Sequence, residues 1–265
     1  MKYTLGFIGC GNMGGALVTA AAKRVDPKKI VVCDRHVEKT QVLEKTCGVA
    51  VADAQTVARA CRFVVLGVKP QGLQSAIADI ASILRERTDV VIVTMAAGLS
   101  IDAIRTYIGA ERPIVRMMPN TPVSLGEGMI LYAVSGGDEA TEQEFLAAFS
   151  AAGRFDKIPE EKIDAGSALS GCGPAFAYAF AEALADGGVE CGLPREKAAL
   201  YAAQTLSGAA KMLLEYGHPG DLKDAVCSPG GTTIAGMHAL ERAGLRHAAM
   251  DAVVAAYERT LELKK

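Results

Sequence analysis

Three hydroxyl side chains flank a short glycine-containing turn near the end of the chain. Ser228, Thr232 and Thr233 surround Pro229-Gly230-Gly231, and a helix-like pattern of apolar residues follows from Ile234. Backbone N–H groups at the start of a helix have no partner inside the helix, so these groups and the hydroxyls would converge on one point. A helix start of this kind suits a small carboxylate. The sequence therefore predicts a small-anion site at this turn.

A glycine pattern near the other end of the chain is typical of a dinucleotide site. Gly9, Gly11 and Gly14 form G-x-G-x-x-G between a strand-like stretch at 5–8 and a helix-like stretch at 16–23, which is the context that this fingerprint requires. The alternative is that the glycines only allow a helix to pack closely on a strand. The candidate cofactor-binding residues in this stretch are Ile8, Gly9, Cys10, Gly11, Asn12, Met13 and Gly14.

An acidic residue stands where the second strand is expected to end. Asp34 lies twenty residues after Gly14 and can hold the ribose hydroxyls of NAD, which favours nucleotide binding over simple packing. Arg35 follows directly, and its guanidinium could grip the 2′-phosphate of NADP, which Asp34 would repel. NAD(H) and NADP(H) both remain open as the cofactor.

Three further stretches follow strand-like runs and should line the carboxyl edge of the sheet. Lys69 is either a catalytic cation or, the reading we favour, a structural or cofactor-contacting residue, and Asn120 is equally open. Ordinary turn chemistry would explain each stretch taken alone. The candidate cofactor-binding residues here are Val68, Lys69, Pro70, Ala96, Ala97 and Asn120.

These residues need a scaffold, and the hydrophobic pattern predicts an α/β fold. Strand-like runs at 30–33, 63–68, 90–95 and 113–117 alternate with helix-like runs at 37–46, 73–87, 101–108 and 139–152. The alternation indicates a mostly parallel, doubly wound sheet. We expect a Rossmann-like NAD(P)-binding domain over residues 1–158.

The second half of the chain is predicted to be helical. Helix-like runs at 175–185, 195–215 and 245–263 are separated by glycine- and proline-containing breaks. We expect an all-α domain over residues 159–265, with the boundary near Pro159. The run Ala175–Ala181 is apolar on every side, so it should be buried within a bundle or against another subunit.

Composition narrows the class of protein. The chain has 265 residues, is 50% hydrophobic and has a formal charge of −2, which predicts a globular, cytoplasmic protein with no footprint for nucleic acid or a membrane. Seven cysteines without a C-x-x-C motif favour reduced thiols over disulfides or a metal site.

The catalytic motifs that the sequence lacks also narrow the possible reactions. None of the four histidines has a partner pattern that marks a general base, and no hydrolase triad, zinc-protease motif or P-loop is present. Hydride transfer involving an alcohol usually requires such a base. A protonated cyclic imine does not, because its carbon is already electrophilic and needs only to be positioned while its carboxylate is held.

The motifs together resemble those of the pyrroline-5-carboxylate reductase family, from Gly6 to about Glu262. The specific part is the run 228–234, supported by Ser-Gly-Cys-Gly-Pro-Ala at 170–175 and Met-Pro-Asn-Thr-Pro at 118–122. The resemblance implies NAD(P)H-dependent reduction of 1-pyrroline-5-carboxylate to L-proline, the final step of proline biosynthesis.

The resemblance also implies roles for individual residues. Thr233 would be the catalytic residue that hydrogen-bonds the ring nitrogen, while Ser228 and the backbone of Gly231 and Thr232 would hold the substrate carboxylate. It further implies a helical domain that joins two subunits into a homodimer, and a decamer of five dimers in many members. No metal is implied.

The chain departs from the family pattern at several positions. Cys172 replaces a common Ser, Asp34 and Asp53 stand where Asn is frequent, and Ala225 replaces an Asn that reaches the cofactor of the neighbouring chain in some members. The two carboxylates weaken a simple preference for NADP.

Two other functions compete with this interpretation. β-Hydroxyacid dehydrogenases have a similar first half, but their catalytic Lys and Asn would fall on Ala177 and Ala181. A nucleotide-sensing regulator could use the glycine fingerprint without chemistry, yet it would not need a helix start rich in hydroxyls. Oxidation of a reduced nicotinamide in the presence of pyrroline-5-carboxylate distinguishes the three.

Overall fold

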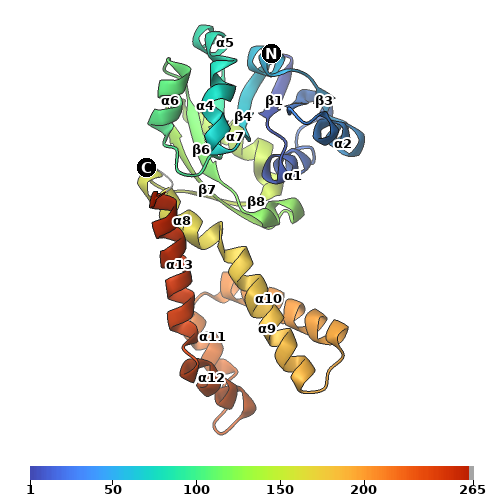
Figure 1. The fold of residues 1–265 in the computed structure, drawn as a ribbon, viewed down its shortest axis with the longest axis vertical. Helices are drawn as coiled ribbons and strands as arrows, with labels where there is room; N and C mark the ends of the chain where they lie inside the picture. The colour runs from blue at the N-terminus through green and yellow to red at the C-terminus, as the bar shows by residue number, and fades with distance from the viewer. Residues whose placement is uncertain (263–265) are drawn as a thin grey trace. The chain divides into compact units, whose positions relative to one another are not determined.

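The computed structural model describes residues 1–262 as two compact units, which we treat separately (Figure 1). The first unit contains Met1–Cys172 with the described residues from Tyr257 onward, and the second contains Gly173–Ala256. The first unit ends at Cys172 before it resumes at Tyr257, whereas the domain boundary near Pro159 stays a prediction from the sequence. Helix α8 (Ile163–Ser170) belongs to the first unit because this helix packs on strand β7 (Gly128–Ser135) and buries Ile163 completely.

An eight-stranded sheet forms the centre of the first unit. The strand order is β3-β2-β1-β4-β5-β6-β7-β8, and every neighbouring pair is parallel except β6 and β7. The prediction of a mostly parallel, doubly wound sheet is confirmed. The strands besides β7 are β1 (Tyr3–Ile8), β2 (Ile30–Cys33), β3 (Ala50–Val51), β4 (Cys61–Leu66), β5 (Val91–Thr94), β6 (Ile114–Met118) and β8 (Gly153–Lys157).

Helices cover both faces of the sheet. Successive residues of β4 point to opposite faces, so Phe63 and Val65 enter one apolar core while Val64 and Leu66 enter the other. Helices α1 (Asn12–Ala21), α2 (Val37–Cys47) and α7 (Glu139–Phe149) cover the first face. Helices α3 (Ala54–Ala60), α4 (Pro70–Ala78), α5 (Ala81–Glu86) and α6 (Ile101–Ile108) cover the second, with α8.

The sequence analysis was wrong about one helix of this unit. The expected single helix over 73–87 is two helices, α4 and α5, separated at Asp79 and Ile80. Ile80 leaves helical geometry with φ −125° and ψ −1°, and its side chain is fully buried with those of Ile77 and Leu84. The break therefore turns the chain so that apolar residues on both sides of it reach the same core.

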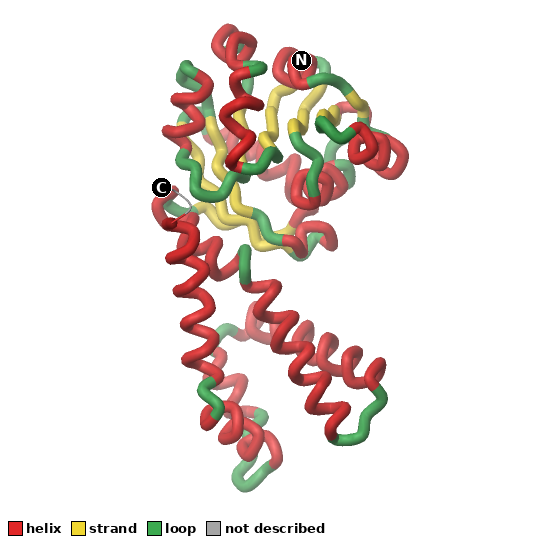
Figure 2. Tube along the Cα trace, in the orientation of Figure 1, coloured by secondary structure: helices red, strands yellow, loops and turns green. Residues whose placement is uncertain are grey.

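The second unit is made of helices alone (Figure 2). Its helices are α9 (Gly173–Glu190), α10 (Arg195–Tyr216), α11 (Pro219–Ala225), α12 (Thr232–Arg242) and α13 (Leu245–Glu262), of which the last also reaches into the first unit; Leu263, expected in that helix, lies outside the described residues. The predicted order of a Rossmann-like domain followed by a helical domain is confirmed.

The apolar helix α9 is not buried within this chain. Tyr178 is 64% exposed and Phe176 is 37% exposed, whereas the buried residues of the second unit, among those described, are Ala185, Ala198 and Ala202. Burial of Ala175–Ala181 inside a bundle of the same chain is therefore wrong, and the alternative of burial against another subunit remains. Among residues 1–262, no helix is both long and apolar enough to span a bilayer.

Candidate nucleotide and anion sites

The glycine-rich turn joins the end of β1 to the start of α1. Gly9 adopts a left-handed φ of 99°, and a Cβ there would lie 2.6 Å from the carbonyl carbon of Gly67. Gly14 is equally confined, since a Cβ on it would lie 2.3 Å from the carbonyl oxygen of Gly9. These two glycines are thus required by close backbone contact, as the packing interpretation expects.

Gly11 differs from the other two glycines of the fingerprint. A Cβ on Gly11 would meet no protein atom within 4 Å, and this residue is the N-cap of α1 with no side chain capping the helix. The first-turn N–H groups of α1 thus have no side-chain cap at the positive end of the helix dipole. Packing does not explain a glycine here, whereas the close approach of a phosphate does. The turn fits a dinucleotide.

The other candidate cofactor residues lie at the same edge of the sheet. Because β1, β4, β5 and β6 are parallel and adjacent, their carboxyl ends place Val68–Pro70, Ala96–Ala97 and Asn120 in a row beside the glycine-rich turn. Ala96 is buried, and Ala97 and Lys69 are exposed. Lys69 is the N-cap residue of α4 and contributes no side-chain cap. Its cofactor contact stays a prediction.

Asn120 has a clear structural task. Its side-chain Nδ2 donates to the carbonyl oxygen of Ser170 at 2.9 Å, and its Oδ1 accepts from the backbone N–H of Met129 at 2.9 Å. The side chain is buried and links the loop after β6 to β7 and to the last turn of α8. The turn-chemistry interpretation accounts for these bonds, and contact with the cofactor remains a prediction.

Asp34 is tied to the glycine-rich turn. Its Oδ2 accepts from the backbone N–H of Cys10 at 2.6 Å, and its Oδ1 accepts from the backbone N–H of His36 at 2.9 Å. Partial burial acts to raise the pKa of this carboxyl, but the two hydrogen bonds outweigh it and leave the pKa below its usual value. Asp34 is therefore ionised near neutral pH. Burial raises the pKa of the neighbouring Cys10 thiol to about 12, so that group is neutral.

The residues predicted to bind an anion lie in the second unit, at the start of α12. The helix begins at Thr232 with Gly231 as its N-cap, and no side chain caps it. The Gly231 N–H donates to the carbonyl oxygen of Ser228 at 3.0 Å. The side chains of Ser228, Thr232 and Thr233 are exposed. The helix start is where the sequence predicts it, with its hydroxyls accessible to a ligand.

Sequence reasoning missed one member of the nucleotide site, Gly67. Its N–H donates to the carbonyl oxygen of Ile8 at 2.8 Å, and a Cβ on Gly67 would lie 2.3 Å from the carbonyl oxygen of Gly9. The only sequence signal is a glycine directly after a buried strand, which acquires meaning once β4 is known to pair with β1.

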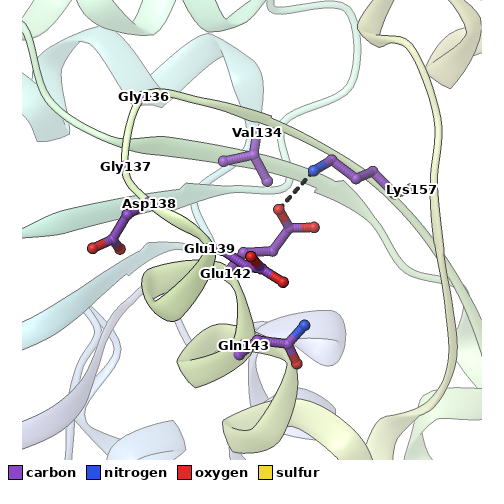
Figure 3. A pocket seen from close by; sticks show the side chains of 8 residues that line it. All are labelled: Val134, Gly136, Gly137, Asp138, Glu139, Glu142, Gln143 and Lys157. Atoms are coloured by element: carbon purple, nitrogen blue, oxygen red, sulfur yellow. Dashed lines mark hydrogen bonds and ion pairs between the residues drawn. The ribbon is translucent and has the colours of Figure 1, made fainter.

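The first unit also has a hollow lined by Val134, Gly136, Gly137, Asp138, Glu139, Glu142, Gln143 and Lys157, with a volume of about 490 Å³ (Figure 3). Strand β7 runs antiparallel to β6, and Ser135 pairs with Ile114 at the amino end of β6. The hollow therefore lies at the edge of the sheet opposite the glycine-rich turn. Glu142 is held there by Lys157 at 2.6 Å and by the Tyr132 hydroxyl at 2.9 Å.

Comparison with known proteins covers both halves of the chain. The family model described as pyrroline-5-carboxylate reductase dimerisation matches residues 160–263, and the model described as NADP oxidoreductase, coenzyme F420-dependent, matches residues 4–98. Pyrroline-5-carboxylate reductase from Pisum sativum is 39% identical over 99% of this chain and 96% of its own length. The chain belongs to the pyrroline-5-carboxylate reductase family.

Other members of the pyrroline-5-carboxylate reductase family show the same full-length likeness. The Escherichia coli enzyme is 38% identical with complete coverage of both chains. The crystal structure of the Coxiella burnetii reductase superposes with a TM-score of 0.91 at 32% identity, and that of Plasmodium falciparum, solved with NADP bound, with a TM-score of 0.88 at 31% identity. Each covers the whole of both chains. Among the described residues, no cluster of His, Cys, Asp or Glu is arranged to hold a metal ion.

Proposed function

We propose that this protein reduces 1-pyrroline-5-carboxylate to L-proline with a reduced nicotinamide dinucleotide. The single observation that carries the proposal is the pair of open helix starts, Gly11 before α1 and Gly231 before α12, in a full-length member of this family. One suits a dinucleotide phosphate and the other a small carboxylate. An enzyme that reduces a carboxylated imine with a dinucleotide requires both.

The first unit would hold the cofactor. Free N–H groups at the start of α1 would bind the pyrophosphate, and Asp34 would accept hydrogen bonds from the adenosine ribose. The row formed by Val68–Pro70, Ala96–Ala97 and Asn120 would lie along the rest of the dinucleotide. When bound, the reduced nicotinamide supplies the hydride.

The second unit would hold the substrate. The hydroxyl of Ser228 and the N–H group of Thr232 would bind the substrate carboxylate at the start of α12, while the N–H of Gly231, which donates to the carbonyl oxygen of Ser228, would hold the turn in place. The exposed hydroxyl of Thr233 would hydrogen-bond the ring nitrogen and so orient the electrophilic carbon. This division of work needs no general base, because the carbon of a protonated imine accepts hydride without loss of a substrate proton.

Dimerisation is part of the proposal. The exposed apolar side chains of α9 and α10 and the scarcity of buried residues in the second unit support a homodimer formed through that unit. Five such dimers would give a decamer, which a solution mass distinguishes from a dimer. We also propose a cytoplasmic location, which cell fractionation tests.

The deciding experiment follows nicotinamide absorbance at 340 nm with pyrroline-5-carboxylate as substrate, using NADH and NADPH in parallel. We expect oxidation of at least one nucleotide that depends on the imine, with proline as the product identified by mass spectrometry. Binding of a nucleotide without oxidation at saturating imine would favour the nucleotide-sensing alternative. Reduction of NAD⁺ or NADP⁺ by a β-hydroxyacid, with no oxidation of NADH or NADPH by the imine, would favour the dehydrogenase alternative.

A further inference from the structure

The carboxylate of Asp34 is fixed in place at the end of β2. Each of its oxygens accepts one backbone hydrogen bond, from Cys10 at 2.6 Å and from His36 at 2.9 Å. An aspartate held by two backbone N–H groups cannot swing away to make room for an anion without losing both bonds. The negative charge therefore has a fixed position beside the glycine-rich turn.

A second carboxylate stands beside the first. Strand β3 pairs with β2 through Val31 with Ala50 and Val32 with Val51, and Asp53 follows two residues after β3 ends. Asp53 caps α3 by accepting from the N–H of Thr56 at 2.6 Å, so it is held in place as well. Both aspartates act on one neighbour, Cys33. Burial is the largest cause of the raised pKa of the Cys33 thiol, and the charges of Asp34 and Asp53 raise it further.

The basic side chains of this region are less well placed to offset the two negative charges. Lys39 and His36 both act on Asp34 and help to keep it ionised, so they already serve one carboxylate. His36 also lies 3.6 Å from Glu38. Arg35 is exposed on a long side chain, next to Asp34 in the sequence. Arg59 likewise acts on Asp53. Of these described side chains, the exposed guanidinium of Arg35 is therefore the remaining cation that could receive a 2′-phosphate beside two fixed carboxylates.

We propose that Asp34 and Asp53 together make this enzyme select NADH over NADPH. The inference rests on the proposed function only in requiring that the dinucleotide bind at the glycine-rich turn. An aspartate at the end of the second strand accepts hydrogen bonds from the ribose hydroxyls of NADH. The 2′-phosphate of NADPH replaces one of those hydroxyl donors with a dianion, which loses the hydrogen bond and meets like charge at short range. Arg35 limits the discrimination but does not reverse it.

The test is a calorimetric measurement of affinity for NAD⁺ and NADP⁺, using the whole protein without imine. We expect NAD⁺ to bind at least about tenfold more tightly than NADP⁺. Adenosine 5′-monophosphate and adenosine 2′,5′-bisphosphate serve as shorter probes that report on the ribose region alone. Tighter binding of NADP⁺ than of NAD⁺ would overturn the proposal.

Variants assign the effect to residues. Asp34→Asn keeps an oxygen that can accept from Cys10, and we expect it to lower the preference for NAD⁺ by about tenfold or more. Asp53→Asn should lower the preference by a few fold, and Arg35→Ala should raise it. Asp138→Asn is the matched control, because Asp138 caps α7 at the opposite edge of the sheet; the preference should not change.

The outcomes separate this inference from the proposed function. An unchanged preference in both Asp34→Asn and Asp53→Asn, with melting temperatures showing folded protein, would overturn the inference even if the imine is reduced. Selective binding of NAD⁺ by a protein that does not reduce the imine would support the inference and contradict the proposed reaction. Failure to bind any nucleotide would contradict both.

Discussion

Gly9 and Gly67 are in backbone contact, with the position of a Cβ on Gly9 only 2.6 Å from the carbonyl carbon of Gly67. The contact brings together the loops that follow β1 and β4, which are neighbours at the centre of the sheet although 58 residues separate the two glycines in the numbering. It leaves Gly11 as the residue of the fingerprint that faces open space. Packing therefore depends on Gly9, whereas ligand binding depends on Gly11, and substitutions can separate the two roles.

The Gly11→Ala variant should remain as stable as the wild-type protein but bind nucleotide more weakly. The added methyl meets no protein atom, but it would occupy the space that the dinucleotide needs, so we expect at least a tenfold loss of affinity by calorimetry. Gly15→Ala is the matched control, since its Cβ has only ordinary contacts at 3.8 Å and 4.0 Å. Equal nucleotide affinity in both variants would place the cofactor elsewhere.

Thr233→Ala should lower catalytic efficiency with imine by about tenfold to a hundredfold, the effect of losing one hydrogen bond to the reacting group, and leave nucleotide affinity unchanged. Thr233→Ser should keep most of the activity because the hydroxyl remains. In the structure Gly231 is the N-cap, and no side chain caps α12. If the alanine variant instead shows a lower melting temperature with normal kinetics, Thr233 only stabilises the helix.

Glu142→Gln should destabilise the first unit in a pH-dependent way. The hydrogen bond from Lys157 is the main reason why the pKa of Glu142 lies below its usual value of 4.5. Burial acts to raise this pKa, and the hydrogen bond from Tyr132 lowers it further. A lowered folded-state pKa means that the carboxylate stabilises the fold above pH 4.5 and that this contribution is lost as the pH falls through the folded value. We expect the variant to lose about 1 kcal/mol of unfolding free energy at pH 7, measured by urea denaturation, and less in acid.

The matched control for that measurement is Glu139→Gln, which changes an exposed carboxylate in the same hollow. It should leave the unfolding free energy nearly unchanged at both pH values. A loss in Glu142→Gln that is the same at pH 7 and in acid would show that the ion pair is not its source.

Tyr178→Asp should weaken self-association. Tyr178 is 64% exposed in the single chain and lies on the apolar helix that we assign to the dimer. Burial of a charge at an interface in place of an aromatic ring costs about 2 kcal/mol or more, a factor of roughly thirty in the dissociation constant. Light scattering across a concentration series measures this, with Glu182→Gln on the same helix as the control. A monomeric wild-type protein at micromolar concentration would contradict the dimer itself.

Local chemistry was enough to predict the elements of both candidate sites. A glycine pattern between a strand and a helix specifies a turn because only glycine adopts the φ of Gly9 freely, and this is decided within a few residues. The helix start at Thr232 follows in the same way from the glycines and hydroxyls before it. Parallel alternation of strands and helices also predicted that the loops after β1, β4, β5 and β6 share one edge.

Tertiary structure decided what depends on residues far apart. Strands β7 and β8 were not predicted because an antiparallel strand added next to β6 lies outside the strand–helix alternation, and the apolar run at 129–134 does not by itself show which strand it pairs with. The break at Ile80 is invisible in a pattern whose apolar spacing continues through it. The bond from Cys10 to Asp34 spans 24 residues, and the exposure of α9 depends on which faces the rest of the chain can cover. The sequence determined which residue types were available for chemistry. Only packing over long separations decided which of them are fixed, confined or left open to a ligand or a partner.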